Sequence, residues 1–325
     1  MADQILRAGV VGAGGIAHAH VSAWQHLGAE VRIFSIDGQA SVLAEHYGVI
    51  EAFSLDELIA SSDVVDVCVP TYVHDEIVLA AAEAGRHVVC EKPLSLTHAS
   101  AQAMIDACRV SGVQMYPGQV VRYFPQYAAA KAAVDAGQIG EPAILRLSRR
   151  SAAPVSGWFA DPALSGGLLV DQMIHDFDYA RWICGDVSAV YAKVVSQGRQ
   201  ATAYAVLTHK NGALSQVTGS WGPPHTVFST SFTISGSGGQ LHHSSLEREV
   251  LRWDAPAVSD GGGELLPVDF APPFITELGE FATAFVGGAA PRVTAEDSLA
   301  ALDIALAAAA SAASGQPVDP KDVVG

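Results

Sequence analysis

The sequence is poor in charge and especially in lysine. Only 16% of its 325 residues are charged, and 18 Lys and Arg face 34 Asp and Glu, for a formal net charge of −16. Nucleic acids and anionic membranes bind basic patches, so we expect neither as a partner. The lysines are Lys92, Lys131, Lys193, Lys210 and Lys321. A lysine that directly follows a buried strand is therefore a candidate functional group.

Cysteine is scarce as well. Cys68, Cys90, Cys108 and Cys184 show no C-x-x-C spacing, which argues against a disulfide or zinc framework. Cys68 and Cys90 lie in apolar runs, where a thiol packs as a small hydrophobe. We expect a reducing, cytoplasmic location and no metal site. No apolar run reaches the roughly 20 residues that span a bilayer.

A glycine-rich turn follows the first apolar run. Residues 6–11 predict a strand, Gly12-Ala13-Gly14-Gly15-Ile16-Ala17 comes next, and residues 16–27 predict a helix. In a G-x-G-x-x-A turn the first glycine permits the tight turn, and the second lets the backbone approach a pyrophosphate. The N–H groups at the helix start then face the phosphates. We therefore predict a dinucleotide site at Gly12, Gly14, Gly15 and Ile16.

An acidic residue ends the second predicted strand. That strand covers residues 30–36 and ends at Asp37, whose carboxylate can accept hydrogen bonds from the adenosine ribose hydroxyls. Residues 38–46 contain no lysine or arginine, so a clamp for a 2′-phosphate is missing and NAD is favoured over NADP. If the strand is shorter, Ser35 is its tip residue and Arg32 becomes relevant; the sequence leaves this open.

Strands and helices alternate as far as residue 120. We predict further strands at residues 64–69, 88–90 and 113–116, and helices at 55–60, 76–84 and 98–111. This alternation is typical of a doubly wound parallel sheet. Residues 1–120 are therefore predicted to be an NAD(P)-binding Rossmann domain of an α/β protein.

The pattern changes beyond residue 120. We predict helices at residues 125–136 and 169–183, a strand at 142–150, and strand-like runs at 190–195, 203–208, 214–220, 229–235 and 250–253. Successive strands without intervening helices indicate a large open, mostly antiparallel sheet. Helices at 274–286 and 295–313 end the chain. Residues 121–325 are therefore predicted to be a second, α+β domain.

A lysine stands at the end of one predicted buried strand. Residues 88–90 are apolar, and Glu91, Lys92 and Pro93 follow directly. Ligands of open α/β sheets bind at the carboxyl ends of strands, and Pro93 biases Lys92 away from a helix. Lys92 is either a functional cation in a cleft or a solvated strand-end charge, and the other motifs favour the first interpretation.

A second candidate site lies in residues 166–178. On an α-helix Asp171, His175 and Asp178 fall at i, i+4 and i+7 and share one face. A carboxylate one turn before a histidine can hydrogen-bond its ring, and histidine exchanges protons readily near neutral pH. The alternative is a solvated polar stripe. Trp158 and the glycines that precede the helix favour an active site.

These motifs occur in a specific order. It runs from Gly12-x-Gly14-x-x-Ala17 through Pro70-Thr71-x-x-His74 and Glu91-Lys92-Pro93 to Gly166-Gly167-x-x-x-Asp171-x-x-x-His175-x-x-Asp178. In this order the chain resembles, nearly end to end, the Gfo/Idh/MocA family, the glucose–fructose oxidoreductase and inositol dehydrogenase-like NAD(P)-dependent oxidoreductases of sugars and polyols.

The resemblance implies a role for each matching position. Lys92 matches the lysine that contacts the nicotinamide ribose and the substrate hydroxyl, and its bond to Pro93 is expected to be cis. His175 matches the general acid/base, and Asp171 the carboxylate that binds substrate. Met173, where many relatives have a small residue, is expected to narrow the pocket. Further positions expected near the cofactor are Pro70, Thr71, His74, Glu91, Arg122 and Trp158.

The resemblance also implies a reaction and partners. Hydride transfer is expected between nicotinamide and a secondary alcohol or ketone of a sugar, inositol or related polyol, with NAD, or else NADP, as cofactor. A homodimer or homotetramer is expected to form through the second domain. One alternative is a non-catalytic regulator that senses NAD(P); another is a dehydrogenase of a non-sugar diol or an acidic sugar. Arg146, Arg149 and Arg150 are the candidates for an acidic group, with a solvated sheet edge as the default interpretation of all three.

Overall fold

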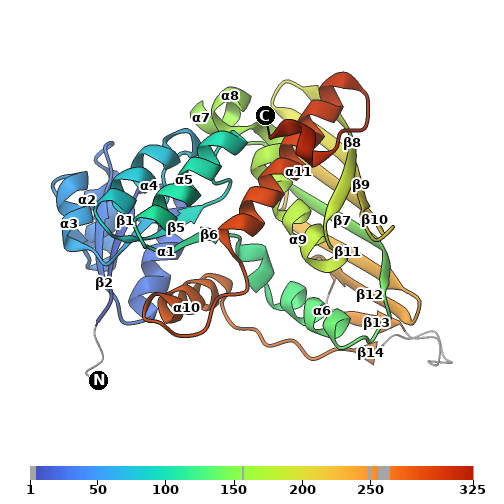
Figure 1. The fold of residues 1–325 in the computed structure, drawn as a ribbon, viewed down its shortest axis with the longest axis horizontal. Coiled ribbons are helices and arrows are strands. Elements are labelled where there is room, and N and C mark those ends of the chain that lie inside the picture. The colour runs from blue at the N-terminus through green and yellow to red at the C-terminus, as the bar shows by residue number, and fades with distance from the viewer. Residues whose placement is uncertain (1–4, 156, 248–250, 255–263, 325) are drawn as a thin grey trace. The chain divides into compact units, whose positions relative to one another are not determined.

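Figure 1 shows the computed structural model, which describes residues 5–155, 157–247, 251–254 and 264–324. The chain divides into two compact units. The first unit comprises residues 1–123 and 271–299, and the second comprises residues 124–270 and 300–325. The sequence analysis draws one boundary at residue 120, whereas the structure places helix α10 (Pro273–Phe285) in the first unit.

The first unit is built on a six-stranded sheet in the order β3-β2-β1-β4-β5-β6, with every pair parallel. This confirms the predicted Rossmann sheet. Its central strands are buried on both faces, as in parallel sheets generally. Sequence analysis missed the short β3 and placed β6 two residues too early. The strands are β1 (Arg7–Val11), β2 (Glu30–Phe34), β3 (Ile50–Glu51), β4 (Val64–Val67), β5 (His87–Glu91) and β6 (Met115–Gly118).

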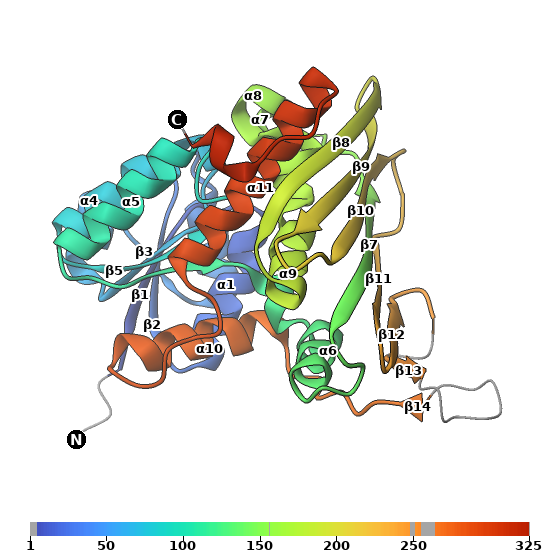
Figure 2. The same cartoon turned by 45° about the vertical axis from the view of Figure 1, so that its right-hand side comes forward.

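Helices cover both faces of this sheet (Figures 1 and 2). On one face Val10, Ile33 and Val89 pack with Trp24 of α1 and Phe281 of α10 in one apolar cluster. On the other face lie α4 and α5, which contact each other. The helices are α1 (Gly15–His26), α2 (Gln39–Tyr47), α3 (Leu55–Ser61), α4 (His74–Glu83), α5 (His98–Val110) and α10. The carboxyl ends of β1, β4 and β5 therefore lie together at one edge, between two helix layers.

The second unit is built on an eight-stranded sheet in the order β14-β13-β12-β11-β7-β10-β9-β8. All its pairs are antiparallel except β10 with β7, which confirms the predicted mostly antiparallel sheet. The predicted strand at 250–253 begins at Val250, outside the described residues, and β12 and β14 were not predicted. The strands are β7 (Pro142–Ala152), β8 (Val187–Gln197), β9 (Gln200–His209), β10 (Leu214–Gly222), β11 (Ser229–Gly236), β12 (Gly239–Ser244), β13 (Arg252–Asp254) and β14 (Glu264–Leu265).

One face of this second sheet is covered by helices α6 (Pro125–Asp135) and α9 (Ile174–Cys184). Tyr127 of α6 and Tyr179 of α9 pack against Phe232 of β11. In both views the opposite face carries no helix of the described chain (Figures 1 and 2). The sheet is therefore open on one side.

Helix α11 (Ala295–Ser314) is the one described helix that is long and apolar enough to cross a membrane, with a mean hydropathy of 1.3. The sequence analysis expected no such run. Half of the apolar window is buried within the protein, and Leu302, Ile304 and Ala308 are almost completely inaccessible. A core helix passes the same test of length and composition, so α11 is weak evidence for a membrane span.

A buried ion pair joins α9 to the middle of the sheet. The Arg149 guanidinium on β7 donates to both oxygens of Asp176 on α9, with N···O distances of 2.8 and 2.9 Å. Burial alone would lower the pKa of Arg149, but the charge of Asp176 raises it above its usual value. The interpretation of Arg149 as a solvated sheet edge is therefore wrong, because β7 is a central strand. Arg146 and Arg150 point to the opposite face and are exposed.

This ion pair makes a testable prediction for stability. Arg149→Ala leaves the Asp176 carboxylate buried without its cation, which should lower the free energy of unfolding by about 3–5 kcal/mol. Arg146→Ala on the exposed face is the control, with an expected change within about 0.5 kcal/mol. Urea unfolding measured by circular dichroism distinguishes the two. Equal effects of both substitutions would contradict the assignment.

Candidate active site

The glycine turn after β1 has the geometry that a dinucleotide site requires. Gly12 has a φ of +110°, a region that residues with a side chain rarely adopt. A Cβ at Gly12 would lie 2.5 Å from the carbonyl oxygen of Cys68 at the end of β4. The close approach of these two strand ends therefore requires glycine at this position.

Gly14 and Gly15 meet a different requirement. Both are exposed, and a Cβ at either would meet no atom within 4 Å. They begin α1, whose first turn carries no acidic side chain, so its N–H groups and the positive end of its dipole suit an anion. Ile16, next in the turn, is half-buried. The residues present therefore fit a pyrophosphate that approaches the backbone closely.

Strand β2 ends at Phe34, so both Ser35 and Asp37 lie in the turn that follows. The Ser35 hydroxyl donates to Asp37 at 2.6 Å, and the Gln39 N–H donates to the same carboxylate at 3.0 Å. These bonds, that of Ser35 first, hold the pKa of Asp37 below its usual range. The carboxylate is ionised and exposed at neutral pH. Arg32 pairs with Glu30 at 3.1 Å.

Lys92 lies on a tight turn at the carboxyl end of β5. The Lys92–Pro93 bond is cis, as predicted. Glu91, the last residue of β5, is 7% exposed, and its Oε2 accepts the backbone N–H of Lys92 at 3.1 Å. The turn is therefore held by the side chain of the residue that precedes the lysine.

His74 holds the other side of this turn. It begins α4 and is buried; Nδ1 lies 3.0 Å from the carbonyl oxygen of Pro93, and Nε2 lies 2.9 Å from that of Val69. Burial lowers the pKa of His74, so the ring is neutral and donates one of these bonds. Thr71 is buried and Pro70 half-buried in the short turn before α4. The structure thus brings Pro70, Thr71, His74, Glu91 and Lys92 to neighbouring strand ends.

The second predicted site is not one continuous α-helix. Leu168–Gln172 form a π-helical turn, Met173 follows, and α9 begins at Ile174. Asp171 and His175 therefore lie on either side of a change in helical geometry, and their predicted i, i+4 relation on one α-helix is wrong. Asp171 and Asp178 are buried, and His175 is half-buried.

Met173 does not have the position that the sequence analysis expected. It is fully buried, and a Cβ on Gly219 of β10 would lie 2.5 Å from its Cγ. The side chain therefore packs on the sheet in the space that Gly219 leaves. Its bulk supports the start of α9 and does not narrow a pocket.

The remaining two predicted residues lie in different units. Trp158 belongs to α7 (Gly157–Ala160) of the second unit and packs against Phe159, with ring centroids 5.2 Å apart. Arg122 of the first unit is 1% exposed, and its Nη1 donates to the carbonyl oxygen of Arg292 at 2.8 Å and to Asp297 at 3.1 Å. Placement of either beside nicotinamide stays a prediction.

Sequence reasoning missed a buried polar cluster beneath Lys92. His20 of α1 lies between the carboxylates of Asp66 on β4 and Glu91 on β5, at 2.8 and 3.1 Å. The sequence did contain one sign of this cluster, Asp66, because a charged residue inside an apolar strand needs a buried partner.

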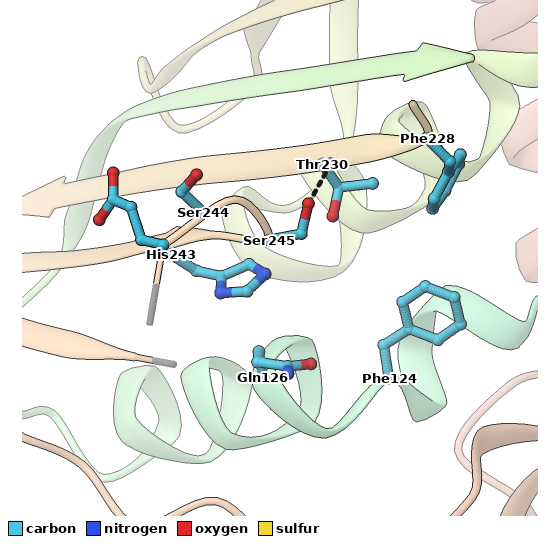
Figure 3. A pocket seen from close by; sticks show the side chains of 8 residues that line it. Phe124, Gln126, Phe228, Thr230, His243, Ser244 and Ser245 are labelled. Atoms are coloured by element: carbon cyan, nitrogen blue, oxygen red, sulfur yellow. Dashed lines mark hydrogen bonds between the residues drawn. The ribbon is translucent and has the colours of Figure 1, made fainter. Parts of the chain in front are cut away.

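The second unit has a small pocket between α6 and the ends of β11 and β12 (Figure 3). Its volume is about 260 Å³, and none of the predicted catalytic residues lines it. Ser245 accepts the backbone N–H of Thr230 across its wall at 2.9 Å. Hydroxyl groups and aromatic rings suit a hydroxylated molecule, but nothing in the lining is suited to transfer a hydride. The lining residues are Phe124, Gln126, Phe228, Thr230, His243, Ser244, Ser245 and Glu247.

Comparison with known proteins identifies the family. Residues 6–119 match the oxidoreductase family with an NAD-binding Rossmann fold, GFO/IDH/MocA, and residues 127–242 match a GFO/IDH/MocA C-terminal domain. The myo-inositol 2-dehydrogenase of Thermotoga maritima is 31% identical over 98% of this chain and all of its own length. The chain belongs to the GFO/IDH/MocA family. It is an oxidoreductase with an NAD-binding domain.

Other relatives agree with this family assignment. The scyllo-inositol 2-dehydrogenase (NAD⁺) of Bacillus subtilis is 28% identical over 87% of this chain and 86% of its own length. The crystal structure of a probable dehydrogenase from Thermotoga maritima covers 98% of this chain and all of its own, with a TM-score of 0.83 and 29% identity. This GFO/IDH/MocA protein carries Lys92 in its first unit and Asp171 and His175 in its second, so their combination in one site is a proposal.

The glycine turn gives a prediction that separates folding from cofactor binding. Gly14 has φ and ψ values that alanine adopts, and no atom lies near the added Cβ. Gly14→Ala should therefore fold with an unchanged melting temperature but bind NADH at least about tenfold more weakly, since the methyl group occupies the space of the pyrophosphate. NADH fluorescence titration measures this. Unchanged affinity would show that the dinucleotide does not approach Gly14.

Proposed function

We propose that this protein is an NAD-dependent dehydrogenase that oxidises a secondary alcohol of a cyclic polyol or sugar, of the inositol type. The observation that carries the proposal is Lys92, held on a turn from both sides at the carboxyl end of β5 in the NAD-binding unit. Ligands of such sheets bind at this edge. The relatives named as inositol dehydrogenases support the substrate class.

The proposed chemistry uses the residues of both units. Bound NAD supplies a hydride acceptor at C4 of its nicotinamide. The His175 imidazole takes the proton of the substrate hydroxyl, while the carbinol carbon loses its hydride and becomes a carbonyl carbon. The Lys92 ammonium stabilises the negative charge that develops on the same oxygen. Asp171 binds the substrate and orients it. In the reverse direction His175 returns the proton.

The first unit contains groups that suit NAD in particular. The turn of Gly12, Gly14 and Gly15 holds the pyrophosphate, and the ionised Asp37 accepts bonds from the adenosine ribose. Arg32, the nearby cation that a 2′-phosphate would need, is paired with Glu30. These contacts support NAD over NADP as the preferred cofactor.

The alternative of an acidic sugar loses its support. The guanidinium of Arg149 is bound to Asp176 in the core, and Arg146 and Arg150 are exposed on the face of β7 that points away from α9. None of the three can therefore meet a carboxylate beside His175. A regulator that only senses NAD(P) would need neither Lys92 nor His175, and the presence of both supports an enzyme.

The proposed roles predict the outcome of two substitutions. In a screen of myo-inositol, scyllo-inositol and common aldoses with NAD, we expect reduction of the cofactor, measured at 340 nm. Lys92→Ala and His175→Ala should each lower kcat at least about 100-fold, because each removes a group that acts on the reacting oxygen. NADH affinity should stay within a few fold in His175→Ala. Full activity of either variant would refute its role, and cofactor binding without turnover of any substrate would favour a regulator.

We further propose that the open face of the second sheet binds a second copy of the chain. Apolar side chains on neighbouring strands point to this face, and Val195 and Tyr204 are 75% and 62% exposed. Tyr191 lies opposite Val206, and Leu214 lies opposite Ile144. Polar side chains such as Lys193 and Gln216 lie between them, but so many large exposed apolar side chains on one sheet face are unusual on a monomer.

This surface predicts that a single introduced charge disrupts the assembly. Val206→Glu places a carboxylate opposite Tyr191 on this face and should shift the dimer or tetramer to monomer in sedimentation velocity at micromolar concentration, since a buried unpaired charge is costly. His18→Glu, an exposed position on α1 of the first unit, is the control and should leave the assembly unchanged. A wild-type chain that sediments as a monomer would refute the proposal.

A further inference from the structure

The imidazole of His20 bridges two carboxylates in the core of the first unit. Nδ1 lies 2.8 and 3.0 Å from the two oxygens of Asp66, and Nε2 lies 3.1 Å from Oε1 of Glu91. His20 and Asp66 are completely buried, and Glu91 nearly so. Polar groups at such depth must satisfy one another, because water does not reach them.

The donors around Asp66 define the protonation of this cluster. The indole N–H of Trp24 donates to Oδ2 at 2.7 Å, and the Cys68 thiol donates to Oδ1 at 3.6 Å. Burial raises the pKa of Cys68 to about 12, so its thiol stays protonated. Both oxygens of Asp66 therefore accept hydrogen bonds, and Nδ1 of His20 carries a proton directed at them. Although burial opposes the charge, Asp66 raises the pKa of His20 well above its usual value, so Nε2–H donates to Glu91.

Glu91 in turn holds the backbone of Lys92. Its Oε1 accepts from His20 while its Oε2 accepts the backbone N–H of Lys92 at 3.1 Å. Gly118, which lies opposite Glu91 on β6, provides the space: a Cβ there would lie 2.5 Å from Oε1. The carboxylate is thus fixed by a donor on each oxygen and by the strand beside it.

A third acidic residue faces the same cluster. Glu277 of α10 is fully buried, and neither of its oxygens has a hydrogen-bond partner among the described residues. Burial first, and the charges of Glu91 and Asp66 second, raise its pKa well above the usual range. Burial therefore favours the neutral form of Glu277, which does not compete with Glu91 for the proton of His20.

We propose that His20 and Asp66 are positioning residues for the strand-tip lysine: they hold Glu91, and Glu91 fixes the backbone from which the Lys92 side chain extends. This rests on the proposed function for the role of Lys92. Glu91 acts in this arrangement through its bonds to His20 and to the Lys92 amide. His20, Asp66 and Cys68 also place potential metal ligands within 4.8 Å of one another, but the oxygens of Asp66 are occupied by three donors and we assign no metal there.

Hydrogen exchange tests the positioning directly and needs no substrate. Glu91→Ala removes the acceptor of the Lys92 amide, so exchange in a peptide covering residues 87–95 should become roughly 10- to 100-fold faster. In Glu91→Gln the side-chain oxygen can still accept the backbone N–H of Lys92, so this variant should restore slow exchange. Gly118→Ala, which leaves Glu91 intact but pushes its carboxylate aside, should act as Glu91→Ala does. Mass spectrometry of the full chain measures all three.

A matched control separates positioning from general stability. Ser62→Ala removes a buried hydroxyl of the first unit, which donates to the carbonyl oxygen of Leu58. It should lower the melting temperature without faster exchange at Lys92. If Glu91→Ala leaves exchange at Lys92 unchanged, or if Ser62→Ala accelerates it equally, the positioning role is wrong.

Turnover of the best substrate in the polyol screen then tests the link to Lys92. Glu91→Ala and His20→Ala should lower kcat at least about tenfold with little change in the KM for NAD, and the double variant should be no worse than Glu91→Ala alone. In a Lys92→Ala background Glu91→Ala should cause no further loss. A further loss there would show that Glu91 acts independently of the lysine. Full activity of Lys92→Ala would refute the proposed function instead, and the exchange result would stand by itself.

Discussion

Ionised groups without access to water impose the strictest constraint on this structure. Asp66 is in the middle of a parallel strand with both faces covered, where an isolated carboxylate would be far too costly to tolerate. His20, Trp24 and Cys68 donate hydrogen bonds to its oxygens. Because these donors come from α1 and from β4 itself, the requirement fixes α1 against the sheet. The glycine turn is at the start of α1, so this cluster also orients the N–H groups that are proposed to face the pyrophosphate.

The second unit also contains a buried charge that needs a partner. Arg149 is placed on a central strand, and its charge requires Asp176 on α9 as a partner. His175 is the preceding residue, so the ion pair sets the rotation of α9 and the direction of the proposed acid/base. Met173 fills the space above Gly219 and so determines how far the same helix lies from the sheet. In both units a residue outside the reaction holds a neighbour that is proposed to take part in it.

The sequence predicted those features that depend on backbone conformation and periodicity. The glycine turn after β1, the alternation of strands and helices and the mostly antiparallel second sheet are confirmed. The cis bond before Pro93, which the family resemblance implied, is confirmed too. The features that it missed depend on contacts between distant residues. Asp66 and His20 are 46 positions apart, and no local pattern shows that they meet. The π-helical turn before α9 was also missed, because a one-residue change in helical spacing leaves no mark in the apolar pattern.

The difference between backbone features and side-chain contacts explains why the sequence identifies the reaction class more readily than the substrate. Cofactor binding depends on main-chain N–H groups and on glycines, and any sequence that keeps the turn keeps the site. Choice among polyols depends on a few hydroxyl contacts whose positions vary with side chains on turns and helix starts. Residues 168–175, which are proposed to provide such contacts, lie where π-helical and α-helical geometry meet, so a small shift there moves Asp171 relative to His175. Relatives at about 30% identity can therefore share the hydride transfer and differ in the alcohol. A polyol that matches this protein must be found from the geometry of that segment and by direct assay.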